Sequence, residues 1–127
     1  MVTDHGIILD LPHIPWASQQ LWDNDVVERG GKYYLIFCAK DKTQTFRLGV
    51  AVANRPEGPF VPQPDPIRGS YSIDPCTFKD DDGQIYVYFR GIWGGQLQRY
   101  AGNKSLAVEH LPQGCEPALP PRVARMT

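Results

Sequence analysis

A strand–turn–strand pattern that occurs twice constrains this chain more than any other feature. In the clearer copy, residues 72–89, an Ile-Asp-Pro sequence leads through the acidic turn Asp80–Gly83 into a strand with alternating tyrosines. An Asp-Gly turn favours a hairpin because glycine accepts a positive φ without steric cost. The alternation of Tyr86 and Tyr88 is typical of a half-buried strand. The sequence therefore predicts a β-hairpin that begins near Asp74, at the end away from the turn.

The second copy of the pattern lies upstream, at residues 25–37. Aligning Gly31 with Gly83 also brings Tyr34 onto Tyr86. A spacing of about fifty residues with short strands and glycine turns is typical of β-propeller blades, although other repeat arrays share it. We expect each copy to continue into a third strand, at residues 46–53 in the first and 96–100 in the second. The predicted blade-like repeats cover about residues 21–61 and 72–108.

The length of the chain limits how much of such a fold it can form. A closed propeller has about four to eight blades, which needs more than about 200 residues. This chain has 127 residues, enough for about two blades of that kind. Its proline-rich tail, residues 111–127, has no clear strand pattern. We therefore predict an all-β fold that is a partial β-propeller.

Composition and charge disfavour several classes of function. The formal net charge of −1 and the lack of a basic patch argue against a nucleic-acid partner. No apolar run reaches the roughly 18 residues of a membrane span. The three cysteines, Cys38, Cys76 and Cys115, form no Cys-x-x-Cys pair, so we expect no metal site and no cofactor. We interpret them as buried, unpaired thiols of a reducing compartment, which, with no signal peptide at residues 1–6, favours a cytoplasmic location.

The motifs of this sequence, taken together, resemble those of glycoside hydrolase family 43, whose members are five-bladed β-propellers that cleave xylan- and arabinan-type glycosides. The resemblance covers nearly the whole chain. It rests on several short motifs together, namely those at residues 21–27, 31–35, 48–53, 55–60, 69–75 and 81–83. One departure is visible, because Trp22-Asp23-Asn24-Asp25 stands where many members have Trp-Ala-Pro-Asp.

The resemblance implies an inverting mechanism with three carboxyl groups. Asp74, in the Ile-Asp-Pro motif, matches the aspartate that tunes the pKa of the general acid and orients it. The general base of the family lies upstream of the stretch that Thr3–Gly6 resembles, and the general acid lies downstream of the Ile-Asp-Pro blade. The chain therefore resembles an internal piece of a longer enzyme, or a truncated product, and we expect it to be inactive alone.

Five further residues or runs are candidates for either a site or a structural role. Trp22 is as consistent with stacking on a sugar as with a core position, and Trp93, among glycines, favours sugar contact. We interpret Asp25 as a structural hydrogen-bonding residue at a strand start. The run Asp80–Asp82 lacks EF-hand spacing and indicates a solvated hairpin tip rather than a calcium site. Glu57, in the turn after the strand predicted at residues 46–53, is interpreted as structural.

Three hypotheses of function follow. The first is a glycosidase fragment acting on xylose- or arabinose-containing oligosaccharides or polysaccharides. The second is a non-catalytic carbohydrate-binding or vestigial propeller fragment, and the third is a scaffold that assembles through open strand edges. Because a partial propeller lacks its neighbouring blades, we expect self-association through open flanks. The apolar residues predicted to be exposed there are Val50, Val52, Tyr86 and Tyr88.

Overall fold

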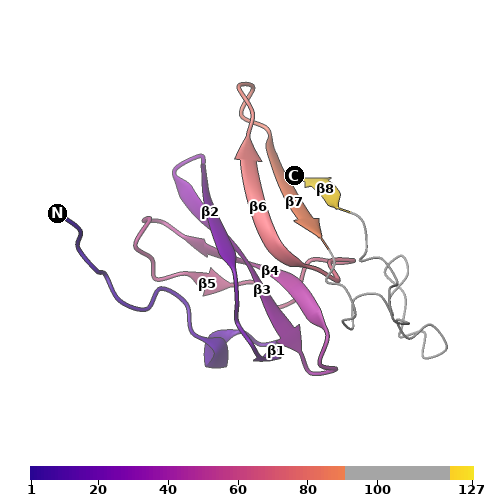
Figure 1. The fold of residues 1–127 in the computed structure, drawn as a ribbon. Helices are drawn as coiled ribbons and strands as arrows, with labels where there is room; N and C mark the ends of the chain where they lie inside the picture. The colour runs from indigo at the N-terminus through magenta and orange to yellow at the C-terminus, as the bar shows by residue number, and fades with distance from the viewer. Residues whose placement is uncertain (91–120) are drawn as a thin grey trace.

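The computed structural model of the protein describes residues 1–90 and 121–127. Within these ranges the chain forms two antiparallel β-sheets and one short 3-10 helix, η1 (Leu11–His13), without an α-helix. The two sheets lie side by side, and β2 of the first runs next to β6 of the second (Figure 1). The predicted all-β class is confirmed for this part of the chain.

The first sheet is built around one long central strand, β3. Along one edge β3 pairs with β2 and then, at its end, with β1; along the other edge it pairs with β4, which pairs with β5. The strands are β1 (Ala17–Gln19), β2 (Asn24–Arg29), β3 (Lys32–Asp41), β4 (Phe46–Ala53) and β5 (Val61–Pro62). The strands predicted near residues 25–37 and 46–53 are therefore present.

The turn between β2 and β3 has only two residues, Gly30 and Gly31, with φ of 61° and 76°. Two consecutive positive φ values define the tight turn whose twist matches that of the flanking strands. Arg29 therefore pairs directly with Lys32, and the register continues to Asn24 opposite Phe37. The sequence of this turn thus fixes which residues of β2 face which side of the sheet.

The second sheet consists of β6 (Ile73–Lys79), β7 (Ile85–Arg90) and β8 (Arg122–Arg125), in that order. The prediction that the tail forms no strand is wrong, because β8 pairs antiparallel with β7. The four residues of β8 contain no proline, and they satisfy the hydrogen-bonding edge that β7 would otherwise expose. The third strand predicted at residues 96–100 lies outside the described residues.

The core has two parts because β3 is buried on both faces. Leu35, Phe37 and Ala39 point to one face, where the segment before β1, including Ile14 and Trp16, covers them. The other face packs towards the second sheet through a cluster made of Cys38, Phe46, Leu48 and Ile73. The strand alternates between the two cores because successive side chains point to opposite faces. The chain thus has an inner core between the sheets and an outer core beneath its N-terminal segment.

The apolar flank of the second sheet differs from the prediction. Of the four residues expected to be exposed, only Tyr88 is, whereas Val50, Val52 and Tyr86 are half-buried. Val50 lines the space between the sheets with Val87 and Phe89 and is covered for that reason. The exposed apolar flank is instead a face of the second sheet, formed by Phe78, Tyr88 and Val123, which are 52%, 49% and 56% exposed.

Candidate active site

Asp74 occupies an unusual backbone position at the start of β6. Its φ is +51°, in the left-handed region that few residues other than glycine adopt, although aspartate tolerates it. The pairing of β6 with β7 shifts register between Ile73 and Cys76, so that the Asp74 backbone departs from the regular ladder. Strained positions of this kind often occur at functional sites, because the surrounding structure must hold them in place. Gln20 and Gln44 also have a positive φ, and Asp74 is the residue of the three that lies in the Ile-Asp-Pro motif.

The Asp74 carboxyl group faces one acidic and one basic side chain. Arg90 Nε lies 3.5 Å from its Oδ2, and Asp23 is the acidic neighbour that acts on its pKa. Partial burial raises the pKa of Asp74 above its usual value, and the neighbouring carboxyl group of Asp23 raises it further. The guanidinium of Arg90 acts in the opposite direction without reversing the shift. Asp74 therefore holds a proton more readily than an ordinary aspartate.

Cys38, in β3, anchors the backbone beside this carboxyl pair. The Trp22 N–H donates to the Cys38 carbonyl over 2.9 Å, and the Cys38 N–H donates to the Asp23 carbonyl over 3.2 Å. Burial raises the pKa of the Cys38 thiol to about 11, so the thiol stays protonated and inert at neutral pH. Cys38 is thus a buried free thiol as predicted, whereas Cys76 is free but exposed, contrary to prediction. Cys115 lies outside the described residues.

Trp22, which directly precedes Asp23, offers an exposed aromatic surface. Its ring centroid is 4.5 Å from that of Phe46, at an interplanar angle of 42°, and Trp22 remains 43% exposed. Lys40 Nζ lies 5.2 Å from the centre of the Phe46 ring. Phe46 therefore packs against the Trp22 ring, while Trp22 keeps a solvent-exposed surface beside Asp23 in the sequence. Trp93, the other tryptophan predicted to contact sugar, lies outside the described residues.

The residues interpreted as structural have structural contacts. Asp25 accepts hydrogen bonds from the backbone of Val26 and from Thr77. The run Asp80–Asp82 is exposed at the β6–β7 turn, and Glu57 pairs with Arg55. In the described ranges no three His, Cys, Asp or Glu residues gather to bind a metal ion. No helix of the described part is long and apolar enough to cross a membrane.

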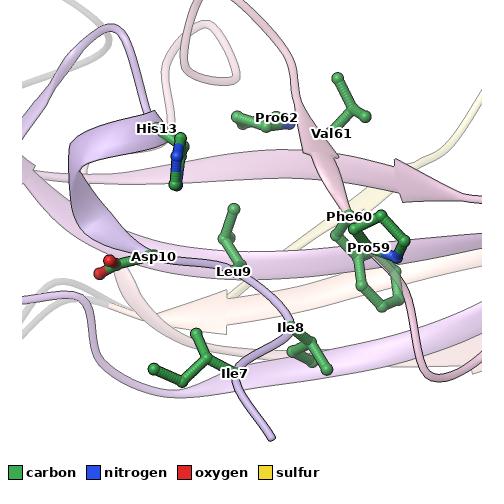
Figure 2. A pocket seen from close by; sticks show the side chains of 9 residues that line it. All are labelled: Ile7, Ile8, Leu9, Asp10, His13, Pro59, Phe60, Val61 and Pro62. Atoms are coloured by element: carbon green, nitrogen blue, oxygen red, sulfur yellow. The ribbon is translucent and has the colours of Figure 1, made fainter.

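A hollow of about 580 Å³ lies elsewhere, between the N-terminal segment and β5 (Figure 2). Its polar side chains are Asp10 and His13, and Asp10 is occupied in accepting a hydrogen bond from the Leu11 N–H. The remaining lining is apolar: Ile7, Ile8, Leu9, Pro59, Phe60, Val61 and Pro62. This hollow shares no residue with the Asp23–Asp74 pair and lacks the paired acid and base of a hydrolytic site.

The sequence pattern described as "Glycosyl hydrolases family 43" matches residues 3–113. The chain belongs to glycoside hydrolase family 43. It is 69% identical over 124 residues to a "Beta-xylosidase" of Xylanibacter ruminicola, covering 98% of this chain and 39% of that protein. It is 55% identical over 126 residues to a "Xylosidase/arabinosidase" of Bacteroides ovatus, covering 99% of this chain and 39% of that one. The family 43 chain therefore spans well under half the length of these relatives.

Solved structures of family 43 enzymes share its fold. The GH43_1 enzyme from Xanthomonas citri complexed with xylotriose superposes with a TM-score of 0.85 at 53% identity, over 98% of this chain and 38% of that one. The same enzyme has been solved complexed with xylose, also with a TM-score of 0.85. The predicted fold class, all-β with about two blades of a five-bladed β-propeller, is confirmed by this agreement. The two sheets are accordingly called blades below.

Sequence reasoning found Asp74 but missed the two residues that face it. Asp23 precedes β2 and Arg90 ends β7, so neither is near Asp74 in the sequence. The sequence did contain a signal for Asp23. It stands where many members of family 43 have the alanine of Trp-Ala-Pro-Asp. Arg90 had no comparable signal. Its position opposite Asp74 follows from the β6–β7 register, in which Ile73 pairs with Arg90.

Proposed function

We propose that this family 43 chain is the part of an inverting glycosidase that supplies the modulating carboxylate, Asp74, and that the complete enzyme hydrolyses xylose- or arabinose-containing glycans. The observation that carries the proposal is the Asp74 site itself. Its carboxyl group stands at a strained position beside a second carboxyl group and an arginine. The strong similarity to xylosidases and arabinosidases supports the substrate class.

The chemistry explains the role assigned to Asp74. An inverting glycosidase needs a general acid for the leaving oxygen and a general base for water, with their carboxyl groups about 6.5–9.5 Å apart. A third carboxylate near the acid raises the acid's pKa by repulsion and keeps it protonated near neutral pH. Asp74 would supply this third charge. In this proposal the acid and the base belong to other parts of the complete enzyme, so the chain alone does not turn over substrate.

Trp22 is proposed to contact a sugar ring. Its exposed indole is backed by Phe46 and lies one residue from Asp23. An aromatic face provides a large, rigid contact surface for the apolar side of a sugar. The xylotriose and xylose complexes of the Xanthomonas citri enzyme support an oligosaccharide as the ligand class.

A chimera tests the catalytic proposal directly. The matching segment of the Xylanibacter ruminicola β-xylosidase would be replaced by this chain, to which it is 69% identical over 124 residues. The chimera should hydrolyse an aryl β-xyloside or an aryl α-arabinofuranoside, and Asp74→Asn should lower its kcat about 10²- to 10⁴-fold with little change in KM. The pH limb that reports the general acid should move to lower pH. The exposed loop variant Asp65→Asn is the matched control.

Each result of that assay bears on a different part of the proposal. A folded, inactive chimera would contradict the assignment of this segment to a working glycosidase. Unchanged kcat in Asp74→Asn would contradict the role of Asp74 alone. Turnover above background by the isolated 127-residue chain would contradict its catalytic incompleteness.

The exposed Trp22 also favours a second candidate, a carbohydrate-binding fragment without catalysis. Titration of the isolated chain with xylotriose, followed by tryptophan fluorescence, tests it. If this candidate holds, xylotriose should bind, and Trp22→Ala should weaken binding by about 3- to 10-fold, the range expected for an aromatic contact. Val61→Ala, on the far edge of the first blade, provides a control for nonspecific loss.

A further inference from the structure

A β-bulge in β6 turns the Asp74 side chain towards Arg90. Ile73 stands opposite Arg90 in the register of β6 and β7. Three residues later, Cys76 stands opposite Tyr88, which is only two residues from Arg90, so β6 contains one extra residue. In a regular ladder Asp74 would point to the opposite face from Arg90, because successive side chains alternate. The extra residue and the φ of +51° at Asp74 break this alternation, and Arg90 Nε lies 3.5 Å from Asp74 Oδ2.

The role proposed for Asp74 requires an ionised carboxyl group. A protonated Asp74 carries no charge and cannot raise the pKa of a general acid by repulsion. Partial burial and the neighbouring Asp23 carboxyl group raise the pKa of Asp74, whereas Arg90 is the neighbour that lowers it. The Cys38 thiol, in β3, stays neutral because burial raises its pKa to about 11. Within residues 1–90 and 121–127, Arg90 is therefore the cation that favours the charged form of Asp74.

We propose that Arg90 is a positioning residue for Asp74, whose carboxylate it pairs with, orients and keeps ionised. The inference rests on the proposed function and adds to it a residue that acts through Asp74. An arginine side chain keeps its charge throughout the pH range of a folded protein, so the ion pair forms or breaks with the ionisation of Asp74 alone. The Arg90 and Asp74 side chains are 67% and 37% exposed. Exposed ion pairs are weak, so Arg90 adjusts the pH range in which Asp74 is charged rather than fixing its charge at every pH.

The titration of Asp74 tests the ion pair without any substrate. Carbon-13 NMR of the aspartate carboxyl carbons would be recorded on the 127-residue chain across the acidic pH range. Arg90→Gln should move the Asp74 midpoint to higher pH by on the order of half a pH unit, the size expected for an exposed pair. Arg90→Lys keeps the charge and should restore most of the wild-type midpoint. Arg55→Gln, which breaks the exposed ion pair of Arg55 with Glu57 in the first blade, is the matched control and should leave the midpoint unchanged.

A double-mutant cycle in the chimera tests whether Arg90 acts through Asp74. At the acidic end of the pH profile, Arg90→Gln should lower kcat about threefold with little change in KM, the factor that corresponds to half a pH unit. The loss should shrink towards neutral pH, where Asp74 is ionised with or without the arginine. In the Asp74→Asn background the same substitution should have no further effect, because no carboxylate remains to be paired. Arg90→Lys should restore the acidic part of the profile.

The outcomes separate this inference from the proposed function. An Asp74 midpoint that is the same in the wild type and in folded Arg90→Gln would overturn the positioning role. Equal losses of kcat with and without the Asp74 carboxylate would also overturn it, because Arg90 would then act independently of Asp74. An inactive chimera together with a shifted Asp74 midpoint in Arg90→Gln would refute the proposed function and leave the Arg90–Asp74 ion pair established.

Discussion

Asp25 and Thr77 connect the two blades through a double hydrogen bond. Asp25 Oδ2 accepts from the Thr77 backbone N–H over 2.6 Å and from the Thr77 hydroxyl over 2.7 Å, across 52 residues of sequence. The two residues lie on β2 and β6, one strand from each sheet. Asp25 Oδ1 also accepts from the Val26 N–H, so both carboxylate oxygens are used. This contact fixes the relative position of the strands that carry Asp23 and Asp74 at their starts.

Asp25→Ala should therefore destabilise the chain. The substitution leaves two half-buried donors of Thr77 without their charged acceptor, which costs about 1–3 kcal/mol of unfolding free energy. Urea denaturation of the variant and of the wild type measures the difference, with Asp65→Ala as a control at an exposed position. A free energy of unfolding no lower than that of Asp65→Ala would show that this contact does not hold the blades together.

Asp74→Asn should have the opposite effect on stability, and the effect should depend on pH. Because the folded protein raises the pKa of Asp74, the folded state favours the protonated carboxyl group, and stability is lost as pH rises through the range between the unfolded and folded pKa values. Asparagine carries no charge and avoids this loss. The free energy of unfolding of the variant relative to wild type should therefore grow from acidic to neutral pH and then level off. A difference that is constant with pH would argue that Asp74 is not destabilised by ionisation.

Gly49→Ala should disturb the outer core. A Cβ atom at Gly49 would lie 2.6 Å from Trp16 Cζ2 and still closer to Phe37 Cζ, whose ring stacks on that of Trp16 at a centroid distance of 5.8 Å. Neither buried ring has room to withdraw, and overpacking of this kind costs about 1–3 kcal/mol. Thermal unfolding measures the loss. In the Phe37→Leu background, which lacks the nearer ring but keeps Trp16, the alanine should cost clearly less than in the wild type. A cost that is the same in both backgrounds would mean that the clash with Phe37 is not the cause.

Tyr88→Lys should reduce self-association of the isolated chain. Tyr88 pairs with Val123 in the register, and together with Phe78 they form the exposed apolar face of the second blade. Contiguous exposed apolar area favours association, and a charge at its centre opposes it. Light scattering at several concentrations measures the effect. Val61→Lys, at a 65% exposed position of the first blade, is the matched control. A wild-type chain that is monomeric at all concentrations would refute the proposal of association through open flanks.

Local chemistry explains what the sequence could predict. The Gly30–Gly31 turn and the Asp-Gly turn at Gly83 require positive φ values, and the structure gives all three glycines such values. Their positions determine two hairpins and, through the register of each, which face of the sheet each side chain of β3 and β7 points to. Asp74 was found through its motif, and the interpretation of Asp25 as structural followed from its place at a strand start.

The parts that escaped prediction depend on contacts that are distant in sequence. Asp23 and Arg90 meet Asp74 only because two blades pack together and a register shift redirects β6. The strand β8 has no alternating pattern of its own and forms because β7 offers an open hydrogen-bonding edge. Such features follow from the assembled sheets, and a pattern within one segment does not encode them.

The left-handed backbone at Asp74 also limits which residue types this position tolerates during evolution. At a φ of +51°, side chains branched at Cβ and most large side chains are strained, while glycine, asparagine and aspartate are tolerated. Only one of those three carries a carboxyl group. A lineage that abandoned catalysis could therefore drift from aspartate to asparagine or glycine without loss of fold, but glutamate would be a poor substitute even though it keeps the charge. If Asp74 has the role proposed above, an asparagine or glycine at this position in a related sequence would indicate that the role has been lost while the fold has been kept.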